Sequence, residues 1–225
     1  MAAGGPGARL GADLPKAFVD LGGVPLFVRA LAAMTAAADL TEAIVVVPPD
    51  RMSEAEAALR DRGSWRIAVK VAAGGAQRQD SVRAGIAAVE EADLIAIHDA
   101  ARPFVDRATV NAAIIAAADR GAAVVGLPAV DTIKEVDAAG RVQSTLDRSR
   151  LWLAQTPQVF RADLIRAAHA RALAEGFVGT DDSALVERLG AEVFFVCGNF
   201  ENRKITTADD LQWAQWLLSS GRAPR

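Results

Sequence analysis

Short, almost wholly apolar runs alternate along the chain with longer segments whose apolar residues recur at helical spacing. The apolar runs are rich in β-branched residues, so we expect strands at 43–47, 67–71, 94–98, 122–127 and 193–196. The segments between them predict helices at 25–38, 51–62, 78–91, 108–120, 162–175, 181–189 and 208–219. Strands that are apolar on both sides belong inside a sheet covered by helices on both faces.

This alternation of strand and helix predicts a fold class. Successive βαβ units with right-handed crossovers build an α/β fold with a doubly wound, mostly parallel sheet of the Rossmann-like type. The chain has 225 residues, of which 52% are hydrophobic, and this size suits one domain spanning residues 1–225. Ligands of such sheets gather at the carboxyl ends of the strands.

Residues 131–158 break the rhythm. The segment contains Thr, Asp and Gly residues, and 137–140 (Asp-Ala-Ala-Gly) suits a turn, so we expect a β-hairpin that projects from the domain. A two-stranded hairpin is marginally stable alone in water. The segment is therefore predicted to be a dimerisation arm that packs on a partner subunit.

Charge and composition narrow the classes of function. The chain carries 25 Lys and Arg against 28 Asp and Glu, a net charge of −3, which argues against a broad basic face for nucleic acid. An anion such as phosphate must then meet a few local cations and backbone amides. Without a signal peptide or a long apolar run, the sequence predicts a cytoplasmic protein that does not enter a membrane. The one cysteine, Cys197, lies in an apolar run, so we expect it to be buried and unpaired.

Two local patterns carry candidate chemistry. The N-terminal loop has three glycines within four positions, at 4, 5 and 7, followed by Arg9 and Lys16, so amides and two cations can converge on a polyphosphate. Asp99 follows an apolar run, where a carboxylate at the end of a strand can hold Mg²⁺ against phosphate oxygens. The alternatives are an ordinary flexible terminus for the loop and a helix cap or turn for Asp99.

A longer series of motifs adds a resemblance to a known family. In order, these are Ala-Ala-Gly (2–4), Pro-Lys (15–16), Gly-Gly with Arg-Gln-Asp-Ser-Val (74–82), His-Asp-Ala-Ala-Arg-Pro (98–103), Asp-Thr-Ile-Lys (131–134), Asp-Arg (147–148), Thr-Pro-Gln (156–158), Thr-Asp-Asp (180–182) and Asn-Arg-Lys-Ile-Thr (202–206). The series resembles that of the 2-C-methyl-D-erythritol 4-phosphate cytidylyltransferases of the non-mevalonate isoprenoid pathway. It runs from residue 2 to about residue 215, and its ordered succession is more specific than any single motif.

The resemblance implies an activity and a set of site residues. The family transfers CMP from CTP to methylerythritol phosphate and releases pyrophosphate, with Mg²⁺ as cofactor and as a homodimer. The loop around cytidine and triphosphate is matched by Ala2, Ala3 and Gly4, and the residues that read cytosine are matched by Gly75 and Ser81. The cations on the phosphates are matched by Arg9, Lys16 and Lys204, and the metal site by Asp99 with Glu201. The surroundings of the polyol phosphate, some of them reached from the partner, are matched by Arg102, Thr132, Arg148 and Thr156.

The chain departs from the family pattern in three places. No apolar strand precedes the Ala-Ala-Gly loop, although the family has one inside the sheet, so we expect that the recorded start is too late and that this chain folds poorly or binds CTP weakly. The glycine loop is one residue longer, with Pro6 inserted, which bears on the match of Arg9. Glu201 stands where many relatives have aspartate.

Two other interpretations stay open on the sequence. Within the same class, the acceptor can be another polyol phosphate such as ribitol 5-phosphate. From a different class, a nucleotide-binding or assembly protein without activity would explain the absent strand, although the retention of Lys16, Asp99, Arg148 and Lys204 argues against it. A dinucleotide oxidoreductase is disfavoured, because no acidic ribose-binding residue follows the run at 43–47.

Overall fold

The computed structural model describes residues 1–4, 14–37 and 40–224 of the chain. Its strands are β1 (Glu42–Val47), β2 (Ala68–Ala73), β3 (Leu94–Ile97), β4 (Ala122–Pro128), β5 (Lys134–Val136), β6 (Val142–Thr145), β7 (Trp152–Arg161) and β8 (Phe194–Cys197). Its α-helices are α1 (Leu26–Ala37), α2 (Met52–Asp61), α3 (Arg78–Ala87), α4 (Arg107–Arg120), α5 (Ala162–Glu175), α6 (Asp182–Arg188) and α7 (Ala208–Ser219). Three short 3₁₀ turns are η2 (Lys16–Phe18), η3 (Pro49–Arg51) and η4 (Arg148–Arg150).

Side-chain caps fix where several helices begin. Asp106 accepts a hydrogen bond from the backbone N–H of Thr109 at 2.7 Å, which starts α4, and Gly121 ends that helix with a φ of 92°. At α7, the side chains of Thr207 and Asp210 each accept a bond from the other's backbone N–H. Because these polar residues satisfy the first N–H groups, the two helices start within a residue or two of the positions that the sequence pattern predicted.

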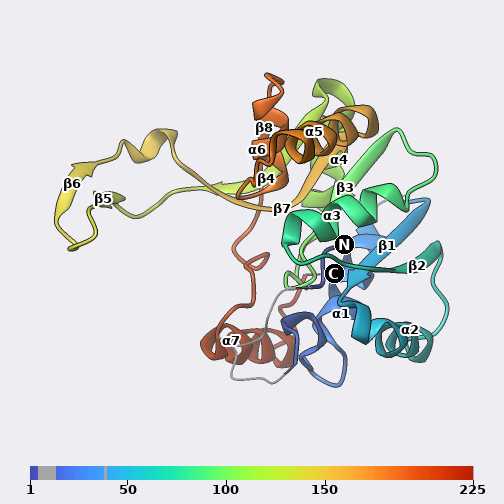
Figure 1. The fold of residues 1–225 in the computed structure, drawn as a ribbon. Helices are drawn as coiled ribbons and strands as arrows, with labels where there is room; N and C mark the ends of the chain where they lie inside the picture. Colours follow the sequence, from blue (N-terminus) through green and yellow to red (C-terminus); the bar gives the residue numbers. More distant parts are fainter. Residues whose placement is uncertain (5–13, 38–39, 225) are drawn as a thin grey trace.

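The fold class is confirmed as α/β, and the sheet is mixed. One group of strands has the order β3-β7-β4-β8 and another pairs β1 with β2. β4 and β8 are parallel, as are β1 and β2, whereas β7 runs antiparallel to both β3 and β4. β5 and β6 form a separate antiparallel hairpin that stands out from the body in Figure 1.

Residues 1–3 lie between the two groups of strands. Ala2 forms parallel bridges with Val46 of β1 and with Asp99 beyond β3. Behind these residues a cleft of about 320 Å³ separates the two strands, and it is lined mainly by apolar side chains, among them Ile44 and Ile95. The sheet is therefore joined at the carboxyl ends of β1 and β3 and open toward their amino ends.

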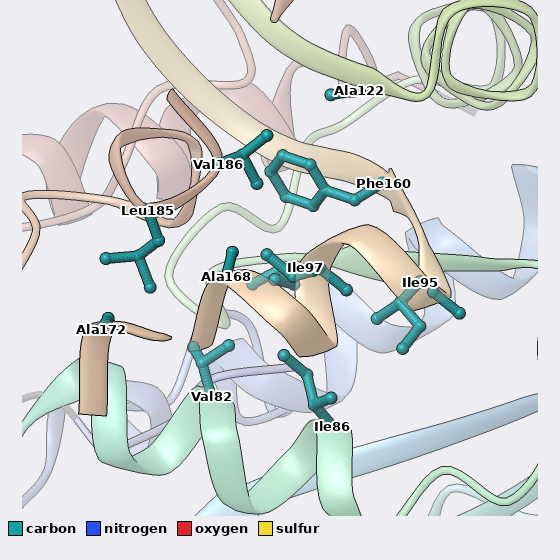
Figure 2. Packing of buried hydrophobic residues seen from close by; sticks show 12 residues of the cluster. Val82, Ile86, Ile95, Ile97, Ala122, Phe160, Ala168, Ala172, Leu185 and Val186 are labelled. Atoms are coloured by element: carbon teal, nitrogen blue, oxygen red, sulfur yellow. The ribbon is translucent and has the colours of Figure 1, made fainter. Parts of the chain in front are cut away.

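Helices cover both faces of the sheet. On one face, α1 and α2 pack on β1, and α4 packs on β4 and β7. On the other, Val82 and Ile86 of α3 meet Ile95 and Ile97 of β3, with α5 and α6 completing the cluster (Figure 2). Side chains of β3 alternate between the two faces, as a strand buried on both sides requires.

Two expectations from the sequence are wrong in detail. The predicted arm ended at residue 158, but Gln155 to Phe160 are buried in the sheet as part of β7. The projecting arm therefore ends before Gln155. Cys197 is exposed rather than buried, because it ends β8, which lies at the edge of the sheet. In the described part of the chain, no helix combines the length and the apolar character needed to cross a membrane.

Candidate active site

A pocket of about 170 Å³ lies beyond the carboxyl ends of β1, β2 and β3. Its lining comes from segments far apart in the chain, and it includes eight of the residues singled out by the sequence: Ala2, Ala3, Gly4, Lys16, Gly75, Ser81, Asp99 and Lys204. Carboxyl ends of parallel strands are where ligands of α/β sheets bind. The fold thus brings these eight residues to one pocket.

The glycine pair after β2 is shaped by close contacts. The backbone N–H of Gly75 donates to the hydroxyl oxygen of Ser81 at 3.2 Å, and that hydroxyl donates to the carbonyl of Gln77 at 3.1 Å. A Cβ on Gly75 would clash with the Cβ of Asp80, and a Cβ on Gly74 would come within 2.7 Å of the Ser81 hydroxyl. Glycine is thus required at both positions for the loop to fold over the start of α3.

Asp99 is the electrostatic centre of the pocket. One carboxylate oxygen, Oδ2, lies 2.7 Å from Nζ of Lys204 and 3.7 Å from Nε of Arg102, and the other, Oδ1, lies 3.3 Å from Nε of Arg78. Burial by itself would raise the pKa of this carboxyl, but Lys204, Arg78 and Arg102 hold the pKa well below its usual range. Asp99 is therefore ionised throughout the physiological pH range.

A buried polar platform, made of His98, Thr156 and Asn202, supports the turn that carries Asp99. The backbone N–H of Asp99 donates to the hydroxyl oxygen of Thr156 at 3.0 Å, and that hydroxyl lies 3.0 Å from Nδ1 of His98. Burial lowers the pKa of His98 to about 4, so the ring is neutral, accepts from Thr156 at Nδ1 and donates from Nε2 to the carbonyl of Arg102. Thr156, matched above to the surroundings of the polyol phosphate, thus lies beneath the Asp99 turn.

Arg102 is held by the same platform. Its Nη1 donates to the carbonyl of Asn202 at 2.8 Å, and the Asn202 side chain donates to the carbonyl of Thr156 at 2.8 Å. Asn202 is fully buried and stands two residues before Lys204. The platform therefore fixes the segment that brings Lys204 to the pocket.

Other residues singled out by the sequence lie elsewhere. Thr132 and Arg148 are exposed on the arm, and Nη1 of Arg148 donates to the carbonyl of Val130 at 2.7 Å. Glu201 is partly exposed and is not among the residues that line the pocket. Arg9 lies outside the described residues.

Two charged residues that the sequence analysis left without a role are brought to this region by the fold. Arg78, the first residue of α3, lines the pocket, and its Nη1 lies 2.8 Å from Oδ2 of Asp182. Asp182 begins α6 and its side chain is 1% exposed. Both residues stand in motifs of the series, Arg78 shortly after the glycine pair and Asp182 in Thr-Asp-Asp (180–182), but neither motif indicated that the two side chains pair.

The donor set suits one kind of metal site. Within the described residues, no group of three or more His, Cys, Asp and Glu side chains is gathered to hold an ion by itself. Mg²⁺ is commonly held by one or two carboxylates together with phosphates of the substrate, and the ionised Asp99 supplies such a carboxylate. The residues therefore fit a magnesium ion that arrives with a nucleotide.

Comparisons with known proteins agree with this geometry. The family model for 2-C-methyl-D-erythritol 4-phosphate cytidylyltransferase matches residues 1–220. The enzyme of that name from Geotalea uraniireducens is 41% identical over 226 residues, covering 99% of this chain and 97% of its own, and that from Acidobacterium capsulatum is 44% identical over 209 residues, covering 91% and 87%.

Solved structures give the same result. The 4-diphosphocytidyl-2C-methyl-D-erythritol synthase of Anaerococcus prevotii aligns with a TM-score of 0.84 at 28% identity, covering 96% of this chain and 95% of that one. The 2-C-methyl-D-erythritol 4-phosphate cytidylyltransferase of Thermus thermophilus aligns with a TM-score of 0.76 at 36% identity, covering 91% and 94%.

Proposed function

The chain belongs to the 2-C-methyl-D-erythritol 4-phosphate cytidylyltransferase family, and we propose that it transfers CMP from CTP to 2-C-methyl-D-erythritol 4-phosphate in isoprenoid precursor biosynthesis. The observation that carries the proposal is the pocket, where a glycine loop, two lysines and an ionised aspartate from distant parts of the chain line one space. Both substrates are multiply charged phosphates, so we place the reaction in the cytoplasm.

CTP binds with its cytosine at Gly75 and Ser81 and its triphosphate along residues 2–4. Backbone groups of a glycine can approach the pyrimidine edge closely, and the tight loop disfavours a larger purine. Lys16 and Lys204 line the pocket, and the family resemblance adds Arg9 as a third cation for the phosphates. These cations offset the charge of the nucleotide.

The reaction is an in-line displacement. An oxygen of the acceptor phosphate attacks the α-phosphorus of CTP, the bond from that phosphorus to the bridging oxygen breaks, and pyrophosphate leaves with the electron pair. The acceptor is already an anion, so no strong base is needed. Lys16 and Lys204 stabilise the charge that develops on the α-phosphoryl and leaving oxygens. Asp99 would hold Mg²⁺, which neutralises phosphate charge when bound. Glu201, outside the pocket lining, is kept as a second acidic group only by the family resemblance.

The acceptor site is shared between two subunits of a homodimer. Arg102 lies beside Asp99, whereas Thr132 and Arg148 are exposed on the arm that leaves the body of its own chain. An arm placed across a two-fold axis brings these two residues to the partner's pocket, where a guanidinium and a hydroxyl suit a phosphate.

The test is a substrate profile with purified protein. Pyrophosphate release is measured with CTP, UTP, ATP and GTP, each with methylerythritol phosphate, with ribitol 5-phosphate and without acceptor. We expect release with CTP and methylerythritol phosphate and a nucleotide product of the corresponding mass. Preference for ribitol phosphate would move the assignment to another polyol cytidylyltransferase, and CTP binding without turnover would indicate a binding protein.

A further inference from the structure

Arg78 ties together two carboxylates from distant elements. Its Nε lies 3.3 Å from Oδ1 of Asp99, and its Nη1 lies 2.8 Å from Oδ2 of Asp182. The exposed fractions of the two carboxylate side chains are 9% and 1%, whereas that of Arg78 is 32%. One half-buried guanidinium on the pocket wall thus compensates a carboxylate in the pocket and another behind it.

Asp182 is held firmly on its other side. Its Oδ1 lies 3.2 Å from Nε2 of His169, a residue of α5 whose side chain is 3% exposed. The backbone N–H of Asp182 donates to Oε1 of Gln158 at 3.2 Å, and the amide of Gln158 donates to Asp181, which caps α6. The carboxylate of Asp182 is therefore a fixed anchor, packed between two helices and β7.

The three cations around Asp99 differ in how they are held. Among the described residues, the ion pairs of Lys204 and Arg102 are with Asp99, whereas Arg78 has Asp182 as well. Burial lowers the pKa of Arg78 but Asp182 and Asp99 raise it, with a net increase. Arg78 thus has a second ionic partner that does not depend on Lys204.

We propose that Asp182 is a positioning residue: through Arg78 it fixes the rotation of the Asp99 carboxylate, so that Oδ2 is the oxygen presented to a divalent cation. Oδ1 is engaged by Arg78, and Oδ2 is the oxygen that contacts the pocket residue Lys204. A carboxylate whose orientation is set beforehand binds the ion without losing rotational freedom. This role rests on the proposed function, in which Asp99 meets the metal with CTP.

The variants are chosen to separate an effect on the orientation of the Asp99 carboxylate from an effect on the stability of the fold. Asp182→Asn removes the charge with little change in shape, and Glu187→Gln removes a charge from the exposed side of the same helix as a matched control. Arg78→Gln together with Asp182→Asn removes both members of the buried pair. The double variant leaves no unpaired buried charge from that pair, so its stability should recover while Asp99 remains without its guide.

The readout is Mn²⁺ binding by electron paramagnetic resonance, with CTP present, together with CTP titration without metal and thermal melting. We expect Asp182→Asn and the double variant to weaken Mn²⁺ at least about tenfold when each is measured at CTP concentrations that saturate it. Metal-free CTP affinity should stay within about twofold of the parent in Asp182→Asn, whose replaced side chain does not line the pocket. Glu187→Gln should match the parent. Metal affinity that follows the melting temperature, or that is unchanged in the double variant, would overturn the proposal. If the parent itself shows no CTP-dependent Mn²⁺ binding, the proposed function fails instead.

Discussion

Lys204 and Lys16 come from opposite ends of the chain and line the same small pocket. Lys204 contacts Asp99 from a partly exposed position, so its side chain contributes little to the core. We expect Lys204→Ala to lower kcat at least about a hundredfold, because a preorganised cation at a transferring phosphoryl group is lost, with a small change in melting temperature. Lys70→Ala is the control for charge alone, because it removes a lysine of β2 that is paired with Glu42 and Glu90. Turnover near that of the parent would remove Lys204 from the mechanism.

Asp99 is the residue for which charge and shape can be separated. Asp99→Asn keeps the size of the side chain, but an amide lacks the negative charge that a hard cation requires. We expect loss of activity at all practical Mg²⁺ concentrations, measured as rate against added Mg²⁺. Asp119→Asn, at an exposed position of α4, serves as the control. Normal activity of Asp99→Asn at ordinary Mg²⁺ would contradict the metal role.

At the residue scale, prediction from sequence succeeded where a residue sits at a recognisable boundary. Asp99 follows an apolar run and could be placed at the carboxyl edge of the sheet on that ground, whereas Gly75 was singled out only by the family resemblance. The role of Asp182 could not be predicted, because it depends on Arg78 and His169, which other elements bring to it. The platform of His98, Thr156 and Asn202 was not predicted either, because its contacts join residues from distant parts of the chain. Its members are also polar and resemble loop residues in the sequence.

At the element scale, β7 is the strand that the apolar pattern did not reveal. Its buried half contains Gln155, Thr156, Pro157 and Gln158, whose polarity and proline argue against a central strand. The structure accommodates them because the pairing of β4 with β7 shifts register between Val124 and Gly126, and because the polar side chains bond to the platform, to Asn199 and to α6. Burial of polar groups that are fully bonded cannot be read from hydropathy.

In the proposed homodimer, the arm is the element whose function depends on a second copy. Apolar residues are exposed along it and at its base, namely Val130, Val136, Val142, Trp152 and Leu153. Exposed apolar surface of this extent favours an interface. In an arm-exchanged dimer, each acceptor site combines Lys16 of one subunit with Arg148 of its partner.

Mixing two inactive variants tests this arrangement. Arg148→Ala and Lys16→Ala subunits, each tagged differently, are combined, and the heterodimer is isolated by both tags. One of its two composite sites then has both residues intact, so we expect up to about half of the parent activity per dimer. Each variant alone, carried through the same exchange, is the control. Verified heterodimers without activity would mean that every site is built within one chain.

At the scale of the whole molecule, residues 1–3 join the two groups of strands into one continuous sheet. The backbone N–H of Ala2 donates to the carbonyl of His98 at 3.0 Å, and that of Val46 donates to the carbonyl of Met1 at 2.9 Å. The ammonium of Met1 donates to the carbonyl of Ile44 at 2.7 Å. The pattern is a parallel ladder on both sides, and the cleft behind Met1 continues along the same two strand edges.

The buried ammonium makes stability depend on pH. Burial, and after it the charge of Arg78, lowers the pKa of the Met1 ammonium from 8.0 to about 6. The unfolded chain then binds this proton more tightly than the folded chain, so unfolding takes up a proton between pH 6 and 8. The contribution of this group to stability therefore rises with pH through that window and is constant above it.

Joining an apolar segment to Met1 is expected to fill the cleft and stabilise the protein. Four residues such as Val-Ala-Val-Val would extend the ladder along β1 and β3, bury their side chains, and replace the ammonium by a peptide N–H. We expect a melting temperature at least about 5 °C higher, since 1 kcal/mol moves the melting temperature of a protein of this size by about 2–4 °C. Tighter CTP binding should accompany it, because residues 2–4 become fixed at their entry to the pocket.

A Gly-Ser-Gly-Ser extension of equal length is the control, which moves the charge without supplying apolar strand residues. Both extended proteins should lose the dependence of stability on pH between 6 and 8 that is expected for the unextended chain. Mass spectrometry verifies that the unextended chain retains Met1. Equal melting temperatures for the apolar and the Gly-Ser extensions would show that the cleft does not receive a strand.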